Sequence, residues 1–272
     1  MRRGKTDQRG FALLIVLWTL GLLALLGTQL MATARQDTQL ARNLVDAAEL
    51  EAAASGAVQQ AIFANLDTSN KHWDADSITR VIRVGRVPVA VQLDDEAEKI
   101  NPNIASVALL QALMTALGTD RVTAAVVAAS IAEWRQASAV AGRADAVTAR
   151  YVAARREYAP PGTPFTNLDE LEAVFGMTPD LLARLRPHLT IFTDGDPDMA
   201  TRDPVVTQAL VLAGQGGAVG VEGVAGLVSI TADARGRGHA HFTVHVVVRT
   251  NAKAEGRRYE ILAHERIWSS AS

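Results

Sequence analysis

The chain has 272 residues, of which 49% are hydrophobic and 21% are charged, and it contains no cysteine. Its 27 basic and 29 acidic residues give a net charge of −2, which argues against a nucleic-acid binder held by bulk positive charge. The apolar content excludes a wholly disordered chain, and the lack of cysteine excludes disulfides, zinc–thiolate sites and cysteine catalysis.

The N-terminal segment combines a basic start with a long apolar stretch. Residues 1–10 carry four basic side chains and one acidic side chain, and residues 11–34 carry no ionisable group. As a helix, this apolar stretch would span about 36 Å, which is enough to cross a bilayer. The basic cluster predicts that the start of the chain stays in the cytoplasm, so the bulk of the chain lies across the membrane.

Three interpretations of this segment remain open from its residues alone. A secretory signal peptide could be cut after the small-residue motif that ends at Ala34. The segment could also be a plain single-pass anchor. A prepilin-type leader would instead be cut between Gly10 and Phe11, and the apolar helix would be retained.

The residues that follow favour one continuous helix from 11 to 66. Residues 35–66 contain no proline and one glycine, Gly56. Apolar residues recur there at steps of three and four, which is the pattern of an amphipathic helix. They are Leu40, Leu44, Ala47, Ala54, Val58, Ile62 and Leu66. A signal peptide is normally followed by a break, whereas a long helix of this kind suits a subunit that packs beside copies of itself.

The remainder divides into strand-rich and helical regions. Residues 80–93 alternate around Gly85 and predict a hairpin or bent strand, and an acidic loop follows from Asp94 to Asn103. Four helical segments are predicted in the middle of the chain, at 104–118, 120–136, 168–176 and 180–189. Residues 205–214 predict a short helix or strand. Three strands are predicted near the end, at 227–233, 239–249 and 257–268.

The economical fold is α+β, with an antiparallel sheet packed on the long helix and an all-helical subdomain inserted into the sheet. The predicted divisions are a leader at 1–10, a transmembrane helix half at 11–34, an amphipathic half at 35–66, an α+β domain at 67–103 and 205–272, and the insertion at 104–204.

Several segments together resemble one known family. They are RGFALLIVLW, DDEAEKINPN, IAEWRQ and PFTNLDELEAVFGMTPDLLARLRPHLTIFT, followed by the terminal strand triplet. In this order they resemble type II secretion system protein K, a large minor pseudopilin of the general secretion pathway. The resemblance implies a pilin-like fold, removal of the leader after Gly10 by the prepilin peptidase, and methylation of the new N-terminus at Phe11.

The resemblance also implies a location and partners. The chain would be a single-pass inner-membrane protein with its C-terminal domain in the periplasm, placed at the tip of a short pseudopilus that it initiates and caps. Its partners would be the minor pseudopilins similar to proteins I and J, the major pseudopilin and the inner-membrane assembly platform.

Ile15 is a candidate tip-specific position. Pilin-like subunits generally carry a glutamate five residues into the mature chain, and counting from Phe11 this position is Ile15. Such a glutamate can neutralise the N-terminal amine of a neighbouring subunit in an apolar filament core. A subunit with none above it has no such amine to neutralise, so the absence of glutamate fits the tip.

Two alternative functions remain open from the sequence. The segment LDELEAVFGMTP resembles half of a helix-hairpin-helix element, which suggests a membrane-anchored DNA-binding protein of competence type. However, the hairpin lacks a second glycine and its flanks are acidic, so no nucleic acid is expected. A generic anchored exported domain is the other alternative. No catalytic motif stands out in the sequence, so we predict that the chain is not an enzyme.

A bound calcium ion is the one possible cofactor, because aspartates supply the hard oxygen ligands that calcium prefers. Position six of an EF-hand loop starting at Asp194 would be Met199 and position twelve Val205, so an EF-hand is excluded. The candidates for another kind of site are Asp94, Asp95, Asp194, Asp196 and Asp198.

Overall fold

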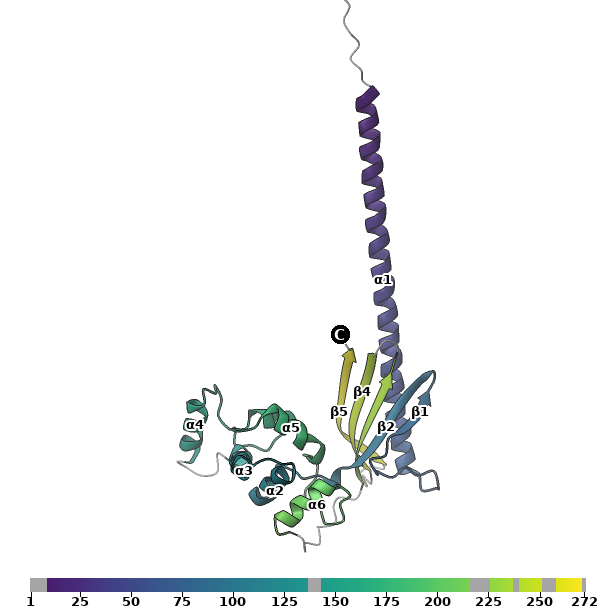
Figure 1. Ribbon diagram of the computed structural model, residues 1–272. Helices are drawn as coiled ribbons and strands as arrows, with labels where there is room; N and C mark the ends of the chain where they lie inside the picture. Colours follow the sequence, from purple (N-terminus) through teal and green to yellow (C-terminus); the bar gives the residue numbers. More distant parts are fainter. Residues whose placement is uncertain (1–8, 137–142, 216–225, 237–239, 251–257, 271–272) are drawn as a thin grey trace, which may run out of the picture.

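The structure, a computed structural model, describes residues 9–136, 143–215, 226–236, 240–250 and 258–270. A long helix rises from a five-stranded antiparallel sheet, and a block of shorter helices lies beside the sheet (Figure 1). The α+β class predicted from the sequence is therefore confirmed. Residues 1–8 of the predicted leader and residues 216–225 of a glycine-rich segment lie outside the described residues.

Helix α1 runs without interruption over Arg9–Leu66. Its last part packs on the sheet through a stripe of residues at helical spacing, all buried: Leu50, Ala53, Ala54, Ala57, Val58, Ala61 and Ile62. Four of these are alanines, whose small side chains let the helix approach the strands closely. The predicted apolar stripe begins earlier in the sequence, but Leu44 is 62% exposed, so packing on the sheet starts only at Leu50.

The sheet follows chain order from edge to edge, with every neighbouring pair antiparallel. The strands are β1 (Arg80–Val84), β2 (Val87–Asp95), β3 (Leu227–Arg235), β4 (Ala240–Thr250) and β5 (Tyr259–Ser270). The predicted hairpin is formed by β1 and β2, and Gly85 supplies the positive φ of +60° in its turn.

The two faces of the sheet have different neighbours. On β4, Val244 and Val246 are buried in the core shared with α1. Because side chains alternate along a strand, Thr243 and His245 point to the opposite face, toward the helical block. This second face is the less apolar one along this part of β4.

The helical block lies between β2 and β3 in the sequence. It contains α2 (Val107–Ala116), α3 (Arg121–Gln136), α4 (Arg143–Ala153), α5 (Pro179–Leu185) and α6 (Pro204–Leu212), and the 3₁₀ turns η1 (Glu96–Glu98), η2 (Leu168–Ala173) and η3 (Arg186–His188). Side chains cap six of these elements by accepting backbone N–H bonds: Asp95, Ser106, Asp120, Asn167, Thr178 and Asp203.

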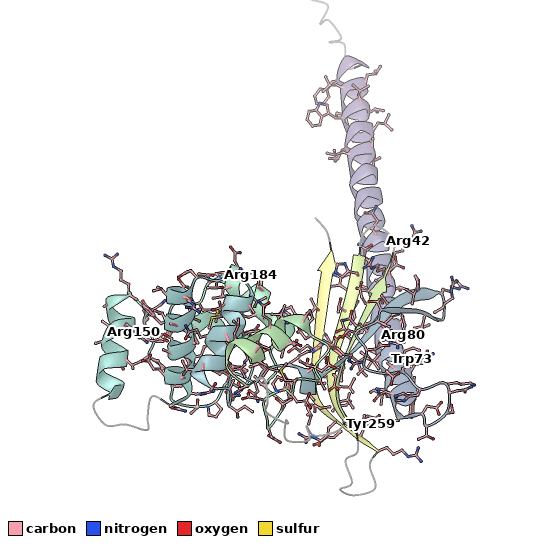
Figure 2. All side chains as sticks on the ribbon, turned by 60° about the horizontal axis from the view of Figure 1, so that its bottom comes forward. Arg42, Trp73, Arg80, Arg150, Arg184 and Tyr259 are labelled. Carbon is pink, nitrogen blue, oxygen red and sulfur yellow. The ribbon has the colours of Figure 1, made fainter. Side chains whose placement is uncertain are left out.

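The block has its own apolar core, in which Leu109, Leu113, Ile131 and Leu171 are buried. On its far side, Arg150 of α4 pairs with Glu133 and lies over the ring of Phe175, 4.7 Å from the ring centroid (Figure 2). The block is thus a packed unit and not a set of surface excursions from the sheet.

Two predicted elements differ from the structure, and helix α6 lies where the sequence predicts a short helix or strand. Asp94 and Asp95 end strand β2, and the next three residues form η1, so the segment predicted as an acidic loop is largely ordered backbone. The segment predicted as a helix at 168–176 is the 3₁₀ turn η2, followed by a turn at Gly176. Helix α6 buries Val206, Ala209 and Leu210 in the core of the block, so the block extends past residue 204.

Candidate assembly surface and acidic pocket

The first part of α1 presents large apolar side chains to the exterior. Phe11 is 71% exposed, Ile15 is 47% exposed and Trp18 is 73% exposed. Gly10 and Phe11, the residues of the predicted cleavage site, lie in the first turn of α1. Within the part of the chain that the structure describes, no helix reaches the length and apolar character needed to cross a membrane.

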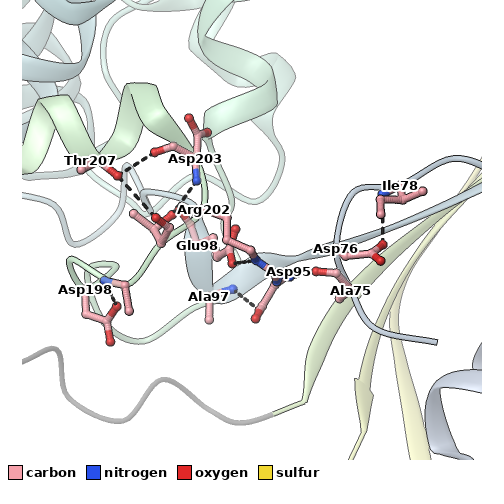
Figure 3. Close-up of polar contacts among 12 residues, drawn as sticks. Ala75, Asp76, Ile78, Asp95, Ala97, Glu98, Asp198, Arg202, Asp203 and Thr207 are labelled. Atoms are coloured by element: carbon pink, nitrogen blue, oxygen red, sulfur yellow. Dashed lines mark hydrogen bonds and ion pairs between the residues drawn. The ribbon is translucent and has the colours of Figure 1, made fainter. Parts of the chain in front are cut away.

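A polar joint connects the sheet to the helical block (Figure 3). Arg202 donates one hydrogen bond to Glu98 Oε1 at 2.6 Å and another to the carbonyl oxygen of Ala75 at 2.6 Å. It therefore joins the segment after α1 and the start of the block to the loop before α6. Beside it, the guanidinium of Arg80 donates to both carboxylate oxygens of Asp76, at 2.9 and 2.8 Å.

A second connection joins the entry of the block to the segment that follows η3. The backbone N–H of Ile100 donates to His188 at 2.9 Å, and Thr190 N–H donates back to Ile100 at 3.0 Å. His188 also pairs with Asp203, the cap of α6. Burial alone would raise the pKa of Asp203, but the hydrogen bond and charge of His188 and the backbone N–H groups of α6 lower it overall.

An acidic pocket of about 190 Å³ lies next to this joint. Its lining includes Asp95 and Glu98 from the entry of the block and Asp196 and Asp198 from a loop before α6. Burial raises the pKa of both Asp95 and Asp196 above the ordinary aspartate value. Among the described residues, no hydrogen-bond partner is found for the buried Oδ1 atom of Asp196. Glu98 pairs with Arg202, Asp95 accepts a hydrogen bond from Ala97 N–H and Asp198 accepts one from Ala200 N–H, so the least compensated atom of the pocket is Oδ1 of Asp196.

The five predicted calcium candidates separate into two groups. Asp95, Asp196 and Asp198 line the acidic pocket, whereas Asp94 accepts a hydrogen bond from Gln92 at 2.8 Å and Asp194 is exposed. In the described ranges, no group of three or more acidic or histidine side chains is arranged closely enough to hold a metal ion. Calcium binding stays a prediction.

The helix-hairpin-helix segment serves packing in this structure. Gly176 has a φ of +84°, and a Cβ atom added there would lie 3.1 Å from Cγ2 of Val127 on α3. Of the basic residues nearby, Arg186 pairs with Asp169, and Arg184 donates to the carbonyl oxygen of Leu117 at 3.0 Å. The hairpin is therefore held against the block, and its nearest cations already have protein partners.

Comparison with known proteins finds a match for the middle of the chain. Residues 90–194 match the family model of type II secretion system (T2SS) protein K. This match supports assignment of the chain to the type II secretion protein K family. A solved structure, the crystal structure of the GspK-GspI-GspJ complex from the enterotoxigenic Escherichia coli type 2 secretion system, has the same fold with a TM-score of 0.57. Its identity to this chain is 17%, and the match covers 87% of this chain and 99% of the other. No curated protein gives a significant match.

The segment matched by the protein K family model includes most of β2, η1 and the block as far as the residues after η3. It contains the entry to the block and one wall of the acidic pocket, but not Arg202 or α6, which complete the joint. Sequence reasoning missed Arg202, because an isolated arginine in a loop carries no pattern. Its only signal is the neighbouring Asp203-Pro204 pair, a helix-start motif that places Arg202 beside a fixed helix end.

Proposed function

We propose that this chain is the minor pseudopilin at the tip of a type II secretion pseudopilus, where it initiates and caps the filament during protein export. The single observation that carries the proposal is helix α1. It is one continuous helix of 58 residues, apolar and exposed in its first part and packed on a sheet in its last part. The sheet and the helical block at its end, called the head below, contain the segment that matches the protein K family model, which also supports the proposal.

Helix α1, called the rod below, can pack side by side with the corresponding helices of other subunits. In a bilayer, helices associate through close van der Waals contact and not through a hydrophobic driving force. The exposed residues of α1, such as Phe11 and Trp18, would pack in lipid before assembly and against neighbouring rods afterwards. The helical block projects to one side of the sheet (Figure 1), which would obstruct a further subunit above it and so end the filament.

The proposal requires cleavage between Gly10 and Phe11, methylation of Phe11 and a single-pass inner-membrane location with the head in the periplasm. N-terminal sequencing of the membrane form tests this directly. A mature chain starting at Phe11 supports the proposal. A start at Arg35 would instead indicate a signal peptide, and a start at Met1 a plain anchor.

We also propose that Ile15 marks the tip position. A glutamate there would have no neighbouring N-terminal amine to neutralise, and a lone carboxylate in an apolar environment is costly. Ile15→Glu should therefore reduce incorporation and secretion, whereas Ile15→Leu serves as the apolar control. Normal assembly and secretion by the glutamate variant would remove any special role of this position.

The proposed partners are minor pseudopilins similar to proteins I and J, with the major pseudopilin, the prepilin peptidase and the assembly platform acting at other stages. The similar solved structure is itself a complex of GspK with GspI and GspJ, which supports this choice. Co-purification of the tagged full-length chain with proteins I and J from detergent-solubilised membranes is the test. Recovery of the chain alone, with both partners present in the membranes, would contradict it.

A further inference from the structure

A groove separates the sheet from the helical block on the side away from α1. Its volume is about 520 Å³. The sheet contributes residues such as His245, Ala263 and Ile267, and the block contributes residues such as Leu168, Ala183 and Phe192. At its floor, the buried Glu96 is paired with Lys99.

Strand β5 forms one wall of this groove and is also an edge of the sheet. Within the described strands, β5 has a neighbour on one side only, β4. Every second backbone N–H and C=O group of an edge strand points outward, where it can pair with an added strand. Figure 1 shows that the free side of β5 faces the helical block, so an added strand would lie between β5 and α5.

The other edge of the sheet is less suited to pairing. Strand β1 has 5 residues, whereas β5 has 12, so β5 offers more backbone groups to an added strand. Two charged residues of β5 already have partners, since Glu260 pairs with Arg249 and Arg266 pairs with Glu51 of α1. On β5, Ile267 lines the groove and is 53% exposed. A long edge strand beside a largely apolar groove is the arrangement by which an extended peptide is recognised, with backbone bonds giving affinity and pockets giving specificity.

The charged residues that line the groove indicate which side chains a bound segment should carry. The groove-lining charges Glu96 and Lys99 pair with each other, as do Asp169 and Arg186. Glu265 is exposed on the same face, and among the described residues no ion pair to it is found. A residue directly opposite Glu265 on an added strand would point into the groove, so a basic side chain flanked by apolar ones is favoured there.

The position of the groove indicates that helix α1 of a neighbouring subunit does not occupy it. Helix α1 covers one face of the sheet, and the groove opens on the other. Subunits that associate through α1 therefore leave the groove outside their bundle of rods.

We propose that β5 and the groove bind an extended polypeptide segment, which adds as a sixth strand and turns an apolar–basic–apolar triplet toward the helical block. The segment belongs to a protein other than a pilin-like subunit. This inference rests on the proposed function only for the statement that the rods associate through α1; strand addition itself stands on β5 and the groove.

The probe is a fluorescein-labelled peptide, Thr-Val-Thr-Lys-Thr-Val-Thr, added to the full-length chain in detergent micelles. Fluorescence polarisation measures binding, and hydrogen exchange of Tyr259–Ser270 reports on the edge. We expect binding together with slowed exchange in β5. Methylating alternate backbone nitrogens on one edge of the peptide keeps its charge but removes hydrogen-bond donors, and each lost bond should weaken binding about threefold to tenfold. Equal binding of the methylated peptide, or no slowing in β5, would overturn strand addition.

Two variants test the groove without touching either core. Ala183 is exposed on α5, and Ala183→Trp should obstruct the groove and abolish binding. Ala153→Trp, the same change at an exposed alanine on α4, should leave binding unchanged. Glu265→Lys should weaken binding of the lysine peptide and strengthen that of a glutamate counterpart. Identical affinities in all variants would refute the assigned site.

Two further outcomes decide the occupant. If the chain alone forms dimers that the peptide dissociates, a second copy occupies β5 and the proposed partner is wrong. If proteins I and J compete with the peptide, a pilin-like subunit is the occupant, with the same consequence. Failure of I and J to bind at all contradicts the proposed function but leaves the peptide result standing, so the two failures are distinguishable.

Discussion

The two apolar cores of this chain should respond independently to cavities. Ile62 of α1 is 1% exposed in the core between α1 and the sheet, and Leu113 of α2 is fully buried in the core of the helical block. Among the described residues, the two buried sets have no member in common. Truncation of either side chain to alanine removes apolar contacts and leaves a cavity, which costs about 2–5 kcal/mol for a leucine or isoleucine.

The expected result is that Leu113→Ala destabilises the block while the sheet stays protected, and that Ile62→Ala does the reverse. Hydrogen exchange measured by mass spectrometry on the full-length chain in detergent resolves the two parts, because strands and helices give separate peptides. The loss should be confined to the mutated part, and the double variant should equal the sum of the single variants within about 0.5 kcal/mol.

A different outcome would refute the two-core interpretation. If Leu113→Ala increased exchange in β2–β4 as strongly as in α2, the joint at Arg202 would couple both parts into one cooperative unit. A pronounced non-additivity of the double variant would lead to the same conclusion. A surface control, Ala153→Ser on α4, should change neither part, since exposed substitutions away from special features have small effects.

Two further predictions concern carboxylates near the joint. Because burial raises the folded-state pKa of Asp196, its charged form destabilises the fold at neutral pH, and this penalty fades as pH falls toward the ordinary aspartate value. Asp196→Asn should therefore raise the unfolding temperature at pH 7 in EDTA and give little gain near pH 4; a gain independent of pH would contradict this. Asp203→Ala removes the cap of α6 and should cost about 0.5–2 kcal/mol in chemical denaturation at pH 7. The loss should shrink in acid, because a lowered pKa gives stability that disappears as pH falls through it; unchanged exchange in α6 would contradict the capping role.

Local patterns predicted the elements well where one physical rule dominated. The continuous apolar and amphipathic sequence predicted α1, and the alternation around Gly85 predicted the β1–β2 hairpin. Capping was also readable: Asn167 accepts a hydrogen bond from Glu170 N–H at 3.0 Å, as a capping residue before a helical turn should. In each case, the deciding contacts lie within a few residues along the chain.

Local patterns could not predict features that depend on contacts between residues far apart in the sequence. Leu44 belongs to a regular apolar stripe, yet it is exposed, since the sheet is too short to reach it. Helix α6 reads equally as helix or strand and joins the block only because Val206, Ala209 and Leu210 fit its core. The acidic pocket brings Asp95 together with Asp196 and Asp198 from a distant loop, and aspartate content alone could not say which of the candidates would meet.

The points where the block leaves and rejoins the sheet suggest a more decisive experiment. Asp95 and Val228 are opposite each other in the β2–β3 register, so the chain leaves the sheet and returns to it at adjacent positions. Antiparallel partners have Cα atoms about 4.5–5.5 Å apart, a gap that a short hairpin turn closes. Replacing residues 97–226 by Asn-Gly should therefore leave β1–β5 and the end of α1 folded.

The excised chain should keep slow hydrogen exchange in β2–β4 and the sensitivity of that region to Ile62→Ala. Loss of protection there would show that the sheet needs the block, for instance through the hydrogen bond from Arg202 to Ala75. Under the proposed function, the excised chain would also retain its rod and still associate with proteins I and J, but it would no longer obstruct a subunit above it. Longer pseudopili built on this variant would support capping by the block, whereas unchanged length would assign capping to α1 or to the sheet.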